Sequence, residues 1–407
     1  MSYKKTTIGA HCSVTSSKRF HASERTKEGV PFYCSKEIIQ KVKGEDVTEC
    51  DYISEDAYKS VKEKYGVPQV GDLLITTRGT YGVPYIYKDY DKFYFADGNL
   101  TWLKDFDDEL DVEYLYYWIN SYEGQKKIDA IAKGTAQKAV PIATLKQIEI
   151  EIPDISTQKK VVCILKAYDE LIENNQKQIK LLEEAAQRLY KEWFVDLRFP
   201  GYEETEIIDG IPNGWAKKSI LENDIFIFSK NKVCPFDGEK QYYATADITG
   251  TTISADGATI TYMNKPSRAS VQPVNNSVWF ARMSNTYKIL NCFGESSHLA
   301  NDSVISSGFA GFTALEGCFG FVYATIASKR FDDEKNRYAT GATQVSLTNE
   351  GLKKIEILIP TIDIVQQYSR MVEPYLEKAE LLKRNCKLLQ QARDRLLPKL
   401  MSGEIEV

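Results

Sequence analysis

Apolar and polar positions alternate along two short runs of the chain and predict a β-strand in each. Residues 148–152 alternate isoleucine with glutamate and end at Pro153, and residues 355–359 nearly repeat this pattern and end at Pro360. A period of two is typical of a strand with one buried face, and proline ends such a strand because it has no N–H for the ladder. Further apolar runs between glycine- and asparagine-rich turns, such as 73–77 and 277–280, predict more strands.

The apolar period lengthens to 3.5 residues after each of these strands, which predicts two long helices with a coiled-coil seam. We expect Pro374 to start the second helix and Pro398 to end it, which leaves about 25 residues, or about 37 Å, of firm helix. Two polar seam positions, Asn175 and Arg393, are expected to fix the register. The predicted seam comprises Leu165, Tyr168, Ile172, Asn175, Ile179, Leu182, Ala186, Leu189 and Trp193, and then Val372, Tyr375, Ala379, Leu382, Cys386, Leu389, Arg393, Leu396 and Leu400.

The second half of the chain repeats the first. Residues 134–194 align with residues 341–401 without a gap, and nineteen of the sixty-one positions are identical. Average residue usage gives roughly four identities by chance. Two equivalent apolar stripes most simply cover each other, so we expect the helices to pair antiparallel around a pseudo-two-fold axis. The alternative is that each helix packs on its own domain.

The predicted fold is α+β, with two mixed α/β domains separated by two long antiparallel coiled-coil helices. A chain of 407 residues is too long for one hydrophobic core. The expected boundaries are 1–153 for the first domain, 154–200 for the central helix, 201–360 for the second domain and 361–407 for the C-terminal helix. No apolar run near the N-terminus resembles a secretory signal, and none approaches the ~20 residues of a membrane span, so we expect a cytoplasmic protein.

The sequence lacks the usual marks of a catalytic or metal-binding chain. Its eight cysteines form no C-x-x-C pair, which argues against a zinc ribbon, and its three histidines are expected to be structural or exposed. No N/D-P-P-Y/F motif of an amino-methyltransferase and no G-x-x-x-x-G-K-[ST] phosphate loop is present. We therefore expect a chain that is not an enzyme and holds no metal or cofactor of its own.

Four stretches of the chain resemble the specificity subunit of type I restriction–modification enzymes. They are Gly134-Thr135-Ala136-Gln137 leading to Pro153 and Gln158, Arg188-Leu189-Tyr190-Lys191-Glu192-Trp193-Phe194-Val195-Asp196, Gly210-Ile211-Pro212-Asn213-Gly214-Trp215, and the run from Leu396 through Leu400-Met401-Ser402-Gly403-Glu404-Ile405. The resemblance covers the whole four-part plan and is most specific in the helices.

The resemblance implies that each domain is a target-recognition domain for one half of a bipartite, asymmetric double-stranded DNA site. The paired helices would hold the domains roughly one DNA turn, ~34–36 Å, apart and dock two methyltransferase subunits. S-adenosylmethionine would belong to those subunits. ATP and Mg would belong to partner subunits too, with motor-nuclease subunits attached through the methyltransferase.

The formal charge of −5 argues against a DNA-binding chain, so any DNA site must rest on local clusters or on basic partners. Loops that mix Arg or Lys with hydroxyl, amide and aromatic groups are the candidates, because Arg pairs with guanine and Asn or Gln with adenine. They could equally be solvated loop residues. The candidates for base reading are Thr77, Arg78 and Tyr81 in the first domain and Arg282, Ser284, Asn285 and Tyr287 in the second, and those for phosphate contacts are Lys18, Arg19, Lys230 and Lys232.

Two other functions remain open from the sequence. One is the specificity subunit of a type IIB-like system, whose partner fuses methylation and cleavage. The other is a coiled-coil scaffold with two protein-binding heads, which the net negative charge favours.

Overall fold

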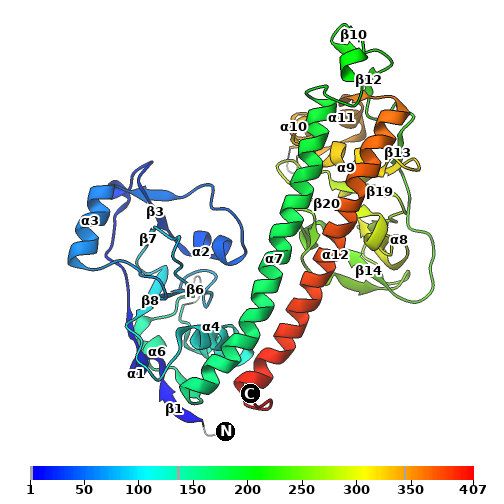
Figure 1. Ribbon diagram of the computed structural model, residues 1–407. Coiled ribbons are helices and arrows are strands. Elements are labelled where there is room, and N and C mark those ends of the chain that lie inside the picture. The colour runs from blue at the N-terminus through cyan, green and yellow to red at the C-terminus, as the bar shows by residue number, and fades with distance from the viewer. Residues whose placement is uncertain (1–2, 135–137, 343–344) are drawn as a thin grey trace. The chain divides into compact units, whose positions relative to one another are not determined.

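The computed structural model describes residues 3–134, 138–342 and 345–407, and the chain divides into two compact units (Figure 1). Unit 1 is Met1–Glu170 with Leu389–Val407, and unit 2 is Leu171–Leu388. The division runs through both long helices, α7 (Ile155–Phe194) and α12 (Ile362–Met401). Each unit therefore holds one mixed domain and a segment of each helix. Thr135–Gln137 and Gln344, which belong to the sequence repeat, lie outside the described residues.

Unit 1 is built on a four-stranded antiparallel sheet in the order β2-β8-β5-β6. A smaller sheet has the order β4-β3-β7, in which β3 runs antiparallel to β4 and parallel to β7. The predicted strand at 148–152 is β9, and it pairs antiparallel with β1. The strands are β1 (Lys4–Thr7), β2 (Ser13–Thr15), β3 (Val30–Tyr33), β4 (Asp51–Ile53), β5 (Leu73–Thr76), β6 (Pro84–Ile86), β7 (Tyr94–Phe95), β8 (Leu100–Lys104) and β9 (Glu149–Ile152).

The core of unit 1 joins its domain to both long helices. Helix α4 starts where the Asp111 carboxylate accepts main-chain N–H bonds from Glu113 and Tyr114, as an N-cap does. Its buried face packs in one cluster with Leu165 of α7 and Leu400 of α12. The helices are α1 (Ile8–His11), η1 (Ala22–Glu24), α2 (Ser35–Val42), α3 (Glu55–Lys64), α4 (Val112–Asn120), α5 (Tyr122–Ile131) and α6 (Ile142–Lys146).

Unit 2 has an antiparallel sheet in the order β13-β22-β19-β20 and a second sheet in the order β17-β14-β21-β18. The predicted strand at 355–359 is β25, which pairs antiparallel with β12. The strands are β10 (Ile207–Ile208), β11 (Ile211–Pro212), β12 (Ala216–Ser219), β13 (Phe226–Ser229), β14 (Lys240–Tyr243), β15 (Ile248–Thr249), β16 (Thr252–Ile253), β17 (Ala258–Ile260), β18 (Ala269–Val271), β19 (Ser277–Ala281), β20 (Ile289–Cys292), β21 (Ser303–Ser306), β22 (Phe309–Ala314), β23 (Ala339–Thr340), β24 (Ser346–Leu347) and β25 (Glu356–Ile359).

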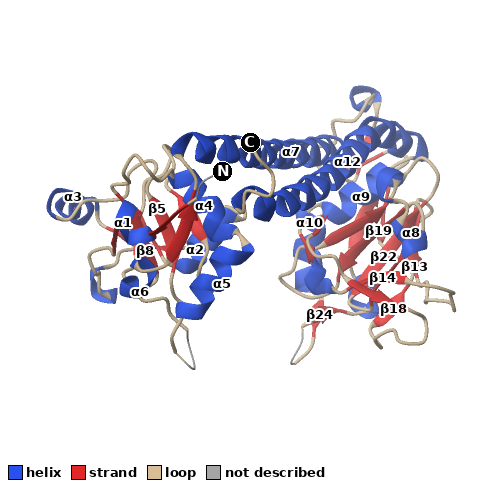
Figure 2. Cartoon of the chain, turned by 90° about the horizontal axis from the view of Figure 1, so that it is seen from below, coloured by secondary structure: helices blue, strands red, loops and turns tan. Residues whose placement is uncertain are grey.

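Helix α9 (Phe319–Ala327) fills the space between the four-stranded sheet of unit 2 and α12 (Figure 2). All nine of its residues are buried, and the Phe321 N–H donates to Ser369 Oγ of α12 at 3.2 Å. The remaining short helices of unit 2 are η2 (Tyr202–Glu204), η3 (Thr245–Asp247), η4 (Gly294–Ser296), α8 (Leu299–Asp302), α10 (Lys329–Arg337) and α11 (Asn349–Lys353).

The repeat extends into the domains, beyond the stretch where the sequences align. The four-stranded sheets correspond strand by strand, because β2, β8, β5 and β6 have the same order and directions as β13, β22, β19 and β20. The second sheets also share one antiparallel and one parallel pairing about β3 and β14. The two domains are therefore copies of one fold whose sequences have diverged.

The long helices contact each other within each unit. In unit 2, Cys386 Sγ donates to the Ile172 carbonyl oxygen at 3.8 Å, and Tyr368 Oη donates to the Ala186 carbonyl oxygen at 2.7 Å. In unit 1, Asp169 of α7 forms an ion pair with Arg393 of α12. Residue numbers rise along one helix as they fall along the other, so the pair is antiparallel. The predicted fold class is confirmed, and the alternative that each helix packs on its own domain without pairing with the other is wrong.

The second helix is longer than the prolines predicted. Pro374 and Pro398 both lie inside α12, which starts at Ile362, directly after Pro360 and Thr361. Proline removes one N–H donor to the carbonyl four residues before it. The carbonyl that loses its donor is that of Arg370. Pro374 and Arg370 are exposed, so water can hydrogen-bond to this carbonyl, whereas Val365 and Tyr368 of the same helix are buried.

The predicted seam was wrong at Tyr375. Its side chain is 39% exposed, whereas the next residue, Leu376, is 3% exposed and belongs to the core of unit 2. Tyr375 and Leu376 are adjacent apolar residues, and either one fits a seam with a 3.5-residue period. The sequence alone therefore does not show which of the two is buried. The other predicted seam residues are buried (Leu165, Ile172, Ala186, Trp193, Val372, Ala379, Leu382, Cys386, Leu400) or half-buried (Tyr168, Asn175, Ile179, Leu182, Leu189, Leu389, Arg393, Leu396).

Candidate functional site

The two loops with predicted base-reading residues occupy equivalent positions in the two domains. Residues 77–83 (loop 77–83) connect β5 to β6, and residues 282–288 (loop 282–288) connect β19 to β20. The Val140 N–H donates to the Thr77 carbonyl at 2.9 Å, and the Leu347 N–H donates to the Arg282 carbonyl at 2.8 Å. Val140 and Leu347 are 207 positions apart, so Arg282 is the counterpart of Thr77.

Two of the three predicted residues in loop 77–83 are engaged within unit 1. Thr77 is 3% exposed, and its hydroxyl donates to the Gly98 carbonyl at 3.4 Å, so it fixes the loop. The Tyr81 hydroxyl donates to Asp129, and this bond raises the pKa of Tyr81. Arg78 is exposed and pairs only through its backbone with Ala139 among the contacts of the described residues. It is the side chain of this loop best placed to meet a ligand.

Arg282 is tied into unit 2. Its Nη1 donates to the Leu347 carbonyl at 2.9 Å, its Nη2 donates to Asn349 Oδ1 at 2.9 Å, and its guanidinium lies 5.8 Å from the Phe228 ring centre. Burial lowers the pKa of this guanidinium. Through its two hydrogen bonds, the Arg282 side chain holds the 347–349 segment. It also faces the groove described below.

The other predicted residues of loop 282–288 contact neighbouring helices. Asn336 Oδ1 accepts the Asn285 N–H at 2.8 Å and Ser284 Oγ at 3.4 Å, and Asn285 has a φ of 54°. The Tyr287 hydroxyl donates to the Ala327 carbonyl at 3.2 Å, and burial raises its pKa. Asn285 and Tyr287 are exposed, whereas Ser284 is half-buried.

A basic groove of about 400 Å³ lies beside Arg282 in unit 2. Lys230, Lys232 and Lys265 line it together with Arg282, and no aspartate or glutamate is among the described residues that line it. Two of the predicted phosphate contacts, Lys230 and Lys232, and one predicted base-reading residue, Arg282, are thus brought together from two segments of the chain. Lys265 and Asn349, which also line the groove, were missed because nothing in their local sequence distinguishes them from other loop residues.

The predicted phosphate contacts of unit 1, Lys18 and Arg19, present less positive charge to a ligand than those of unit 2. Arg19 Nε donates to Asp97 Oδ2 at 2.7 Å, which neutralises its charge locally. Lys18 is exposed, with Nζ 5.4 Å from the Tyr65 ring centre. The two units therefore present different electrostatic surfaces at these predicted positions.

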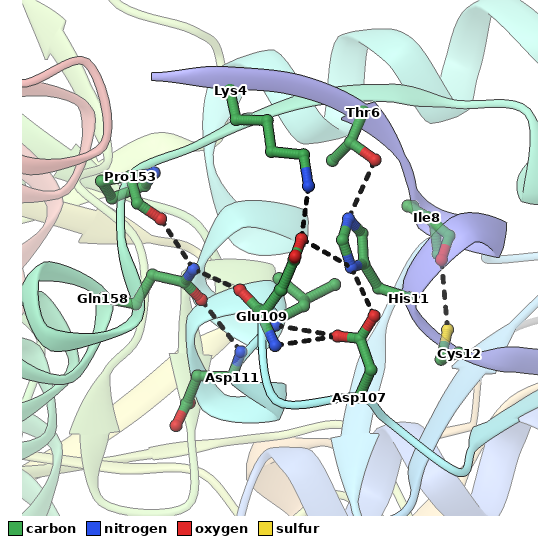
Figure 3. Close-up of polar contacts among 11 residues, drawn as sticks. Lys4, Thr6, Ile8, His11, Cys12, Asp107, Glu109, Asp111, Pro153 and Gln158 are labelled. Carbon is green, nitrogen blue, oxygen red and sulfur yellow. Dashed lines mark hydrogen bonds and ion pairs between the residues drawn. The ribbon is translucent and has the colours of Figure 1, made fainter. Parts of the chain in front are cut away.

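The buried histidine of unit 1 has a structural role, as Figure 3 shows. His11 Nε2 lies 2.8 Å from Thr6 Oγ1 and His11 Nδ1 lies 2.8 Å from Asp107 Oδ2, while the imidazole is 4% exposed. Gln158 of α7 donates to the carbonyls of Glu109 and Pro153 at 2.8 and 2.9 Å. These bonds join β1, the segment before α4 and the start of α7.

The described residues contain no group of three potential metal ligands. In that same part of the chain, every helix is too short or too polar to cross a membrane.

Comparisons with known proteins show a match to one protein family over the first part of the chain. Residues 3–184 match the family described as the type I restriction modification DNA specificity domain. The type I restriction enzyme MjaIX specificity subunit of Methanocaldococcus jannaschii is 28% identical over 72% of this chain and 69% of its own length. The type I restriction enzyme HindI specificity subunit of Haemophilus influenzae is 22% identical over 72% and 77%, respectively.

A solved structure shares the fold over nearly the whole chain. The type I restriction–modification S subunit from M. genitalium covers 98% of this chain and 96% of its own, with a TM-score of 0.59 and 17% identity.

Proposed function

We propose that this chain is a type I restriction–modification specificity subunit that recognises a bipartite, asymmetric DNA sequence, because residues 3–184 match the DNA specificity domain and the relatives of similar length are specificity subunits. The domain of unit 1 would read one half-site and the domain of unit 2 the other. The chain would be the non-catalytic member of its system, and the catalytic activities would belong to other subunits.

One observation carries the proposal: the two domains share a strand order but present different residues at the same place. Loop 77–83 and loop 282–288 are anchored by equivalent main-chain hydrogen bonds, yet one exposes Arg78 and the other exposes Asn285. Equivalent backbones would approach DNA in the same way, and different side chains would select different bases. This arrangement supports two half-sites with different sequences.

The basic groove of unit 2 supports DNA contact despite the net charge of −5. Lys230 and Lys232 are exposed on its wall, and a lysine ammonium neutralises a phosphate without reading sequence. We therefore assign the groove to the DNA backbone and the exposed loop residues to base edges. The DNA affinity contributed by unit 1 would rest more on basic partner subunits, because Asp97 neutralises Arg19.

The helix pair would fix the gap between half-sites and dock two methyltransferase subunits, to which motor-nuclease subunits attach. Two tandem copies of a helix in one chain favour two equivalent docking positions. S-adenosylmethionine, ATP and Mg would be bound by those partners, and the complex would act in the cytoplasm.

Deleting the gene for this chain should remove methylation from one two-part DNA motif with a gap of fixed length. Long-read methylation profiling of cells with and without the chain measures this directly. The control is the same deletion complemented by the intact chain, which should restore the marks. An unchanged methylome would contradict DNA recognition and favour the protein-binding scaffold.

A further inference from the structure

Lys383 of α12 is a buried cation at the helix pair of unit 2. Its side chain is 8% exposed, and Nζ lies 2.8 Å from Glu183 Oε1 of α7 and 2.8 Å from Glu380 Oε1 of α12. Burial by itself lowers the pKa of this lysine, but Glu380 and Glu183 raise it above its ordinary value. The ammonium therefore stays charged and cross-links the two helices.

The third hydrogen bond of Lys383 leaves the helix pair. Nζ donates to the Thr251 carbonyl at 3.0 Å, and the Thr251 hydroxyl donates to Glu183 Oε1 at 2.7 Å. An ammonium has three donors, and here each has an acceptor. Thr251 and Gly250 form the turn between β15 and β16, so this turn is fixed to both helices.

The same turn supports the end of loop 282–288. The Ile289 N–H donates to the Gly250 carbonyl at 2.9 Å, and the Ala281 N–H donates to the Lys288 carbonyl at 2.9 Å, which closes the stem of the loop. A second connection runs from Glu380, which accepts a hydrogen bond from Asn291 Nδ2 of β20 at 3.0 Å. Two routes thus join Lys383 and its carboxylates to the strand that follows the loop.

We propose that Lys383 is a positioning residue that holds loop 282–288 in its DNA-discriminating conformation through the Gly250–Thr251 turn. This inference rests on the proposed DNA-reading role of unit 2. The proposal predicts that replacing Lys383, which belongs to the helix pair and lies far from the loop in sequence, changes the recognition of one half-site only.

The sequence repeat supports an effect confined to unit 2. The counterparts of Glu183 and Lys383 at the 207-residue offset are Gln390 and Gln176, which carry no charge. The first copy therefore lacks this ion-pair cluster. If the cluster were needed simply to pair the helices, we would expect to find it in both copies.

The test uses the assembled methyltransferase complex and DNA duplexes with single substitutions in either half-site. Replacing Lys383 with methionine leaves two carboxylates facing each other and frees the turn. We expect discrimination in one half-site to fall about tenfold, the size of one good base contact, with the other half-site unchanged. Lys383→Arg should retain most of the discrimination because it keeps the charge.

Two further variants keep the test decisive. Thr251→Val removes only the hydroxyl bonded to Glu183 and should relax the same half-site, which decides the matter if Lys383→Met does not fold. Lys387→Met, one turn along α12, removes an exposed pair with Asp256 and should change neither half-site.

Equal losses in both half-sites would overturn the inference by making Lys383 a general stabiliser of the helices. Unchanged discrimination in Lys383→Met, or in Thr251→Val where the former does not fold, would overturn it as well. If the unaltered complex shows no sequence discrimination, the proposed function itself fails, which is a separate result.

Discussion

Replacing Tyr368 with alanine is expected to lower the free energy of unfolding by about 3–5 kcal/mol, the usual cost of removing a buried aromatic ring. Tyr368 of α12 is fully buried, and its hydroxyl donates to the Ala186 carbonyl of α7 at 2.7 Å. Its ring centre lies 5.1 Å from that of Phe194 and 5.8 Å from that of Trp193. The truncation removes the aromatic contact between the two helices in unit 2.

Tyr375 provides the matched control, because it lies two turns further along the same helix and is 39% exposed. Tyr375→Ala should cost less than about 1 kcal/mol, as surface substitutions do. Urea unfolding followed by circular dichroism measures both variants. Equal losses for the two tyrosines would show that the seam at this point follows the sequence pattern rather than the structure.

Replacing Gly311 with alanine should lower the free energy of unfolding by about 3 kcal/mol, at the upper end of overpacking effects. Gly311 of β22 lies opposite Trp279 of β19, and a Cβ there would be 2.4 Å from the indole ring. Trp279 cannot easily move, because it is 1% exposed and its Nε1 donates to Ser277 Oγ at 2.7 Å.

A double-mutant cycle with Trp279→Phe separates this clash from a general backbone effect. The smaller ring leaves room for the new methyl group, so Trp279→Phe should cost about 1 kcal/mol less in the Gly311→Ala background than alone. Thermal unfolding of the four proteins gives the coupling. Additive effects would indicate that the indole is not the obstacle.

The sequence predicted the architecture well because its evidence is periodic. The alternating run at 148–152 and the 3.5-residue spacing after it depend on which faces are buried, and this information is repeated over many residues. It failed where a single residue decides the outcome. Pro374 remains inside α12 because its face is exposed, and exposure is a property of the packed helix pair.

The candidate site was predictable in position but not in contacts. The loops after β5 and β19 were recognised from strand signals and turn residues, and they are equivalent in the structure. The partners of Arg282 are Leu347 and Asn349, more than sixty positions away, and no local pattern reveals them. The charge of Lys383 fits the solvated side of a helix pair in the sequence, and its burial and its ion pair were not predictable because its partner Glu183 lies 200 positions away.

The most direct test of the account inserts one heptad into α7 and one at the matching position of α12. Each helix would lengthen by about 10.5 Å, and the antiparallel seam would keep its period. Methylation profiling should then show the two original half-sites separated by a gap longer by up to about three base pairs. Loss of either half-site sequence, or an unchanged gap in a folded and active complex, would contradict the claim that the domains recognise the half-sites and the helices set the distance between them.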